Sequence, residues 1–263
     1  MRFILSPLIV LSLAAPALSG PAYEPVKLDP ASTVSPPAEL VTAAAAFLDI
    51  VKKGDVDAMG TAMADSLTLI YGSLEMALPR NKEIAGPFRT SKEKLVALSA
   101  YIGGDVESDS EGNPIVSNQI EAARQYIEEA LTNGLSWGAD PMVEGGICSY
   151  AYRSYDQDAV KKLADKMDEQ SSALFYVDAP VSVLKAADAR AGIAATLEPD
   201  LLYVEDYKTD TPIYWHAVHL PDGGSGFISF EAGQLEKPYA GGICFAKNGA
   251  GAWQMVAQAA TGL

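Results

Sequence analysis

Residues 181–230 constrain the fold of this chain more than any other part of its sequence. Short apolar runs alternate there with turn signals about every eight to twelve residues, a spacing typical of a small antiparallel β-barrel or sandwich. The clearest unit is residues 215–230, where an apolar strand is followed by the turn Pro221-Asp222-Gly223-Gly224 and a return strand. We therefore predict a β-hairpin at this place and a β module around it.

The order of features in residues 181–230 resembles the bacterial SH3-type domain of exported proteins. The motifs that carry the resemblance are Val181-Ser182-Val183, Ala195-Thr196-Leu197, Tyr203-Val204, Trp215 with Val218, Asp222-Gly223 and Gly226-Phe227-Ile228. The family's Arg-x-x-Pro loop is replaced by residues 184–188, and Pro199-Asp200 stands where a Gly turn is usual. The resemblance implies an SH3-like small β-barrel that binds cell-wall peptides or proteins.

The first nineteen residues predict a cleaved signal peptide. Arg2 gives a short positive start, residues 3–15 form an apolar run, and Ala17-Leu18-Ser19 has the small residues of a cleavage site. The apolar run is too short to span a membrane. No cysteine lies near the cleavage site, so we expect no lipid anchor. We expect cleavage near Ser19 and a periplasmic or secreted protein with no membrane span.

The composition excludes two classes of partner. Apolar residues make up 49% of the chain, which is enough for a folded core, and the net charge is −15 from 19 basic and 34 acidic residues. Nucleic-acid binding depends on Lys and Arg that neutralise phosphates, and docking on anionic lipid also needs basic residues. Neither is expected for so acidic a chain. The partners that remain are a cell-wall peptide or a periplasmic protein.

The region before the β module is predicted to be mostly helical. Residues 20–37 are rich in Pro without apolar periodicity, which predicts a disordered linker. Ser35 followed by Pro36 is typical of a helix start. Apolar residues then recur at helical spacing over 38–53, 92–102, 115–133 and 158–170.

Other segments of this region are less clear. Gly54 ends the first helix and Asp55 can cap a second, but residues 67–71 fit either a helix or a short strand. Residues 145–152 and 173–177 are rich in β-forming residues.

Near the C-terminus, residues 241–256 predict a closing hairpin with a turn at 248–251. It packs either on the β module or on the first region. The predicted fold class is α+β, with a mostly helical part over 38–176 and the SH3-like module plus hairpin over 177–260.

Two cysteines, Cys148 and Cys244, both follow Gly-Gly-Ile. An even number of cysteines in an exported chain favours a disulfide, and two separate buried thiols are the alternative. A cysteine-dependent hydrolase would need a thiolate beside a histidine. His216 and His219 lie three residues apart on a predicted strand, so they point to opposite faces and cannot easily share a metal.

An acidic run has the alternate spacing of a calcium loop, namely Asp105, Glu107, Asp109 and Glu111, followed by Gly112. Such a loop requires Asp at its first position and Glu at its twelfth. Here Glu107 and Asn118 occupy those positions, so we expect a solvated acidic turn. No metal, cofactor or catalytic residue is predicted.

Aromatic residues gather in the β module, and the predicted ligand-binding residues are Tyr207, Tyr214, Trp215 and Phe227. Small barrels recognise peptides with exposed aromatic side chains, although strand alternation places part of such a set, here including Tyr203, in the core. We therefore expect an exported non-catalytic binding protein. The alternatives are a cysteine-dependent cell-wall hydrolase and a purely structural or assembly protein.

Overall fold

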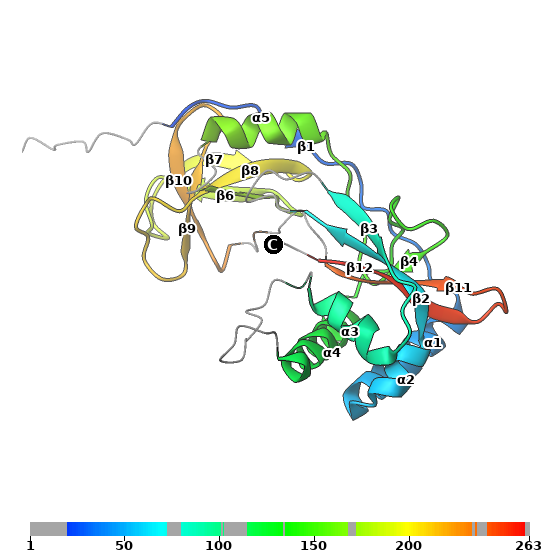
Figure 1. The fold of residues 1–263 in the computed structure, drawn as a ribbon. Coiled ribbons are helices and arrows are strands. Elements are labelled where there is room, and N and C mark those ends of the chain that lie inside the picture. Colours follow the sequence, from blue (N-terminus) through cyan, green and yellow to red (C-terminus); the bar gives the residue numbers. More distant parts are fainter. Residues whose placement is uncertain are drawn as a thin grey trace, which may run out of the picture.

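The computed structural model has an α+β architecture. Helices are concentrated in the N-terminal half, and antiparallel strands dominate the C-terminal half (Figure 1). No helix among the described residues is both long and apolar enough to cross a membrane. The acidic run at 105–112 lies outside the described residues, which are 20–72, 80–100, 102, 115–133, 135–167, 172–232, 235 and 241–260.

All four helices predicted from periodicity are confirmed, with ends that differ by a few residues. These four are α1 (Ala38–Lys53), α3 (Ser91–Ser99), α4 (Val116–Thr132) and α5 (Gln157–Met167), and a short helix, α2 (Val56–Thr61), follows α1. Gly54 ends α1 in the left-handed conformation, and the Asp55 side chain caps α2 by accepting from the backbone N–H of Ala58.

The predicted cap of the first helix is wrong. Pro37 is the N-cap of α1, in extended backbone and without a side-chain hydrogen bond, so Ser35 and Pro36 lie before the helix. Because Pro37 disfavours helical geometry at the residue before it, Pro36 cannot be the first helical residue. Because of the two adjacent prolines, α1 begins at Ala38 and not at Pro36.

A five-stranded sheet packs against α1 to α4, and we call this sheet together with these helices the helical half. Its strands, in spatial order, are β3 (Asn81–Ala85), β2 (Met63–Tyr71), β12 (Trp253–Ala259), β11 (Gly242–Lys247) and β4 (Ile147–Cys148). Residues 67–71 are thus a strand, which settles the ambiguity of the sequence. The closing hairpin β11–β12 joins this sheet, and β12 runs parallel to β2 with Ala257 opposite Thr68.

Helices α1 to α4 lie on one side of this sheet (Figure 1). The buried cluster between them includes Leu40, Phe47, Leu67, Leu95, Ile127, Phe245 and Met255. The rings of Phe47 and Phe245 meet edge to face, with centroids 6.1 Å apart. A separate cluster that contains Ile70 and both cysteines is also buried.

The β module is a seven-stranded antiparallel sheet. Its path is β1 (Val26–Lys27), β8 (Leu201–Asp206), β9 (Trp215–His219), β10 (Ser225–Ser229), β6 (Val181–Leu184) and β7 (Ile193–Leu197), and β5 (Ser172–Phe175) also pairs with β8. The predicted hairpin is confirmed as β9–β10, with Phe227 opposite Ala217. Among the described residues no strand pairing closes this sheet into a barrel.

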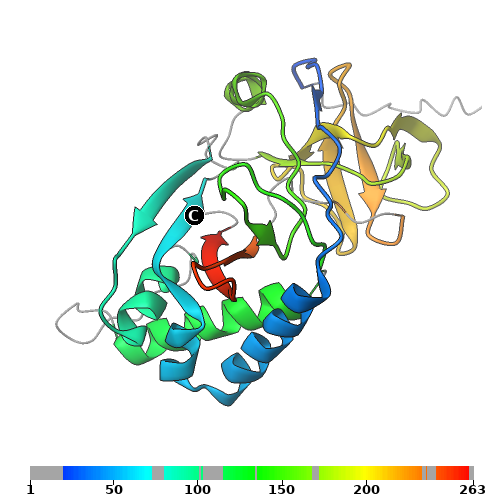
Figure 2. The same cartoon turned by 90° about the vertical axis from the view of Figure 1, so that its right-hand side faces the viewer.

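The segment predicted to be a disordered linker is ordered over residues 20–34. It is extended and donates backbone hydrogen bonds from Gly20 to Gly223, from Leu28 to Asp200 and from Val34 to Trp137. Its side chains Tyr23, Val26 and Leu28 are buried and anchor it. The prediction of disorder rested on the prolines and did not take these apolar residues into account. Figure 2 shows this blue segment running from the β module to α1. It therefore connects the two sheets.

Candidate functional site

Three large apolar side chains are exposed where the hairpin β9–β10 ends. Ile213, Tyr214 and Phe230 have 81%, 68% and 51% of their surface exposed, and we call them the aromatic edge. The rings of Tyr214 and Phe230 meet edge to face, with centroids 6.3 Å apart. Adjacent exposed apolar side chains are more informative than isolated ones, because such patches often mark interaction sites.

A partly buried histidine–carboxylate pair lies against the aromatic edge. The His216 ring stacks on Phe230 with centroids 4.2 Å apart, and its Nδ1 lies 2.5 Å from Oε1 of Glu205 on β8. Glu205 is buried, so its carboxylate holds the imidazole in one orientation. No hydroxyl or thiol among the described residues is hydrogen-bonded to His216. The pair therefore fixes the imidazole against which Phe230 packs.

The structure separates the four residues predicted to bind a ligand. Tyr214 belongs to the aromatic edge, and Tyr207 is exposed in the segment after β8. Trp215 and Phe227 are half-buried. Because side chains alternate along β9 and β10, this pair lies on the sheet face opposite to His216.

Sequence reasoning missed Phe230, although a signal for it existed. His216 is opposite Ile228 in the hairpin register, so Tyr214 is opposite Phe230, two residues further along each strand. The predicted turn fixes this register. Extending it beyond the strand ends would have placed the two rings together.

His219 lies on the other face of β9, as predicted. Its Nε2 is 3.8 Å from Oδ1 of Asp206, and its buried Nδ1 has no hydrogen-bond partner among the described residues. Burial acts to raise the pKa of Asp206, but hydrogen bonds from Thr209 and from the backbone of Lys208, with His219 nearby, outweigh burial and lower this pKa. Asp206 is therefore held in its charged form.

The predicted disulfide between Cys148 and Cys244 is present. The two residues face each other in the pairing of β4 with β11. Neither sulfur is a free thiol, so neither can act as the nucleophile that a cysteine-dependent hydrolase requires.

A buried polar network near the disulfide was not predicted. The Asp140 carboxylate accepts from the Arg80 guanidinium, from the Tyr150 hydroxyl at 2.6 Å and from the backbone N–H of Met142 at 2.9 Å. The Arg80 guanidinium also lies 4.2 Å from the centre of the Tyr152 ring. Burial, followed by the charge of Asp140, raises the pKa of Tyr150. The Asp140 carboxylate is saturated with donors, which is typical of a structural role.

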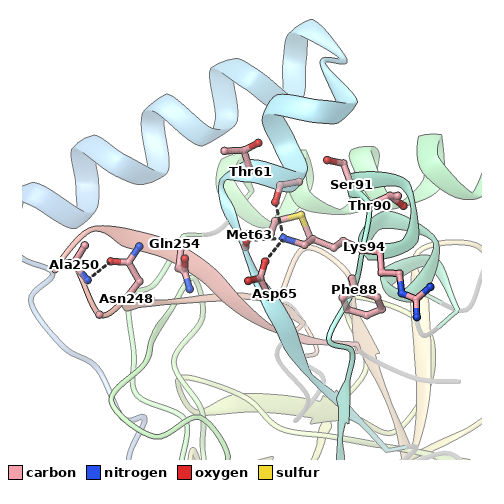
Figure 3. A pocket seen from close by; sticks show the side chains of 13 residues that line it. Thr61, Met63, Asp65, Phe88, Thr90, Ser91, Lys94, Asn248, Ala250 and Gln254 are labelled. Atoms are coloured by element: carbon pink, nitrogen blue, oxygen red, sulfur yellow. Dashed lines mark hydrogen bonds and ion pairs between the residues drawn. The ribbon is translucent and has the colours of Figure 1, made fainter.

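The helical half contains a polar pocket of about 600 Å³. It lies between the junction of α2 and β2, the first turn of α3 and the turn of β11–β12. Buried Lys94 donates from Nζ to the carbonyls of Gly60 at 2.9 Å and Met63 at 3.0 Å, and lies 3.3 Å from Oδ1 of Asp65. In Figure 3, Lys94 reaches toward Asp65, and Gln254 and Asn248 lie on the opposite side.

The pocket retains polar groups that could meet a ligand. Asn248 uses its side-chain oxygen within its own turn, whereas none of the described residues is hydrogen-bonded to the side chain of Gln254 or to the guanidinium of Arg89. Carboxylates and amides are the groups that an arginine and a glutamine bind well.

Comparison of the chain with family models, with curated proteins and with solved structures gave no match.

Proposed function

We propose that this protein is an exported, non-catalytic binding protein whose SH3-like β module engages a cell-wall peptide or a periplasmic protein partner. The observation that carries the proposal is the aromatic edge of Ile213, Tyr214 and Phe230, which is exposed while the Phe230 ring packs against Tyr214 and His216. Small β domains recognise peptides with such aromatic surfaces.

The rigidity of the aromatic edge supports a role in binding. His216 is held by Glu205 and stacks on Phe230, and the backbone N–H of Phe230 donates to the carbonyl of Tyr214 at 3.0 Å. Side chains that are already ordered lose little conformational entropy when a partner binds. The aromatic edge is thus preorganised for binding.

The compartment and the net charge of the chain restrict the kind of partner that we expect. The disulfide is consistent with an oxidising compartment, in agreement with the predicted signal peptide. Exposed Asp210 and Glu231 lie close in sequence to the aromatic edge, in a chain of net charge −15. We infer that the partner presents an apolar side chain next to a positive charge.

A binding assay with matched variants tests this function. The mature protein is sedimented with purified cell wall, and binding is compared for Ile213→Ala and Ile84→Ala, which both truncate an exposed isoleucine. We expect roughly tenfold weaker association for Ile213→Ala and for a Tyr214→Ala, Phe230→Ala double variant, since a central aromatic contact contributes about 1–2 kcal/mol or more. Ile84→Ala on β3 serves as the control and retains full binding.

Two outcomes contradict the proposal. Unchanged binding by the folded double variant would show that the aromatic edge is not the binding surface. No binding of the wild-type protein, to cell wall or to proteins of a periplasmic extract, would favour a structural or assembly role.

The polar pocket favours a second candidate function, the binding of a small carboxylate. Arg89 and Gln254 supply the free donors. A thermal-shift series with small mono- and dicarboxylates tests this function on the wild type and on Arg89→Gln. A shift that persists in Arg89→Gln would contradict it.

A further inference from the structure

The segment from Gly20 to Tyr23 is hydrogen-bonded to the hairpin of the β module. The backbone N–H of Gly20 donates to the carbonyl of Gly223 at 2.8 Å, and that of Tyr23 donates to Pro221 at 2.8 Å. The Tyr23 hydroxyl donates to the carbonyl of His219, also at 2.8 Å. Gly223 has a φ of +89°, and a Cβ there would lie 2.8 Å from the oxygen of Gly20. The turn therefore requires glycine where the segment approaches.

His219 lies directly beside Gly20 and has an unused acceptor. A Cβ placed on Gly20 would be 3.0 Å from Nδ1 of His219. The histidine Nδ1 therefore lies close to the Cα of Gly20, to which the backbone nitrogen of Gly20 is bonded. Nδ1 is buried without a hydrogen-bond partner among the described residues, an arrangement that folded proteins rarely leave uncompensated. Because Nε2 faces Asp206, a proton on Nε2 leaves the lone pair of Nδ1 free to accept.

We propose that this hairpin is a binding site for the α-ammonium group that removal of the signal peptide creates at Gly20. A signal peptidase would hydrolyse the Ser19–Gly20 bond with one water, so that Ser19 leaves as a carboxylate and Gly20 gains a protonated amine. The amide nitrogen has one N–H, whereas the ammonium has three. One keeps the bond to Gly223, and a second donates to Nδ1 of His219.

The consequence is that removal of the signal peptide supplies the last hydrogen bond at this hairpin. An unprocessed or extended chain keeps the single N–H at Gly20 and leaves Nδ1 of His219 unpaired. The mature chain adds a charge-assisted hydrogen bond, which is stronger than a neutral one. The carboxylate of Asp206, on the other side of the imidazole, favours a positive charge there.

The test compares the mature chain starting at Gly20 with the same chain acetylated on its N-terminal nitrogen. Acetylation restores an amide and removes only the ammonium. We expect the acetylated chain to melt roughly 2–4 °C lower, a shift typical of one such interaction in a chain of this size. The ¹⁵N resonance of His219 Nδ1 should also move, a readout that a merely structural contact of Gly20 would leave unchanged.

Variants of the two histidines serve as a matched pair. His219→Phe should abolish the difference between free and acetylated chains, whereas His216→Phe should retain it. Identical melting temperatures and identical Nδ1 resonances in the wild-type pair would overturn the proposal, even if neither variant folds. The proposal rests on the predicted export and not on the aromatic edge. N-terminal sequencing of secreted protein tests that premise by itself, and a mature start other than Gly20 would also overturn the proposal.

Discussion

The Arg80 guanidinium and the Asp140 carboxylate form an ion pair inside the protein, with only 5% and 0% of their side chains exposed. Arg80 directly precedes β3, and Asp140 lies shortly before β4, and these strands are the two opposite edges of the five-stranded sheet. The pair, together with Tyr150, therefore connects the two edges of this sheet.

Arg80→Met should lower the free energy of unfolding by about 3–5 kcal/mol, because it leaves the Asp140 carboxylate buried without its cation. Urea unfolding measures the change. Arg190→Met is the control, since Arg190 pairs with Asp188 at the surface, where solvent screens the pair and its loss should leave stability nearly unchanged. Equal losses in both variants would contradict a structural role for the buried pair.

Reduction of the disulfide should lower the melting temperature and loosen the hairpin β11–β12. The bond joins residues 96 positions apart, and closing a loop of about 100 residues is worth nearly 4.7 kcal/mol in the chain-entropy model, an upper figure. The Cys148→Ala, Cys244→Ala double variant measures the effect without a reductant. Titration of the oxidised, denatured protein should find no free thiol, and two thiols per chain would show that the bond is not formed.

Asp206 should make the β module sensitive to acid. Its pKa is lower in the folded protein than the ordinary 3.8, so its carboxylate stabilises the fold above that pH. This contribution is lost as pH falls below about 3.8 toward the folded pKa. Asp206→Asn should therefore flatten the decline of the melting temperature as pH falls below about 3.8. A decline as steep as that of the wild type would refute this role, and Asp210→Asn is the control.

Gly60→Ala should destabilise the helical half. A Cβ at this position would lie 2.3 Å from Cβ of Ser91, so α2 and α3 would have to separate and the Lys94 contact with the Gly60 carbonyl would weaken. Overpacking of this kind costs about 1–3 kcal/mol. Gly249→Ala, in the turn on the other side of the pocket, is the matched control because nothing lies within 4 Å of its added Cβ. Denaturant unfolding of both variants decides the point, and equal stabilities would show that the contact is not tight.

Local patterns predicted local structure well. The helices and the hairpin β9–β10 follow from periodicity and turn residues, which act over a few positions. Two cysteines in matching Gly-Gly-Ile settings, in a chain with a predicted signal peptide, favoured the disulfide that the structure contains.

Contacts between residues far apart in the sequence could not be predicted from such local patterns. The parallel contact of β12 with β2 joins segments that are more than 180 residues apart in the sequence, and the Arg80–Asp140 pair joins residues that share no local motif. The ordered N-terminal segment depends on backbone acceptors, such as Gly223 and Asp200, that exist only once the sheet is formed. Composition carries no information about these acceptors.

The parallel contact between β2 and β12 determines when the helical half can fold during synthesis. β2 and β3 are translated early, whereas β12, which fills the place between β2 and β11, is translated last. At about 5–20 residues per second, the wait is on the order of ten seconds or more. The growing chain cannot close this core meanwhile, so the helical half stays unfolded until nearly the whole chain has been synthesised.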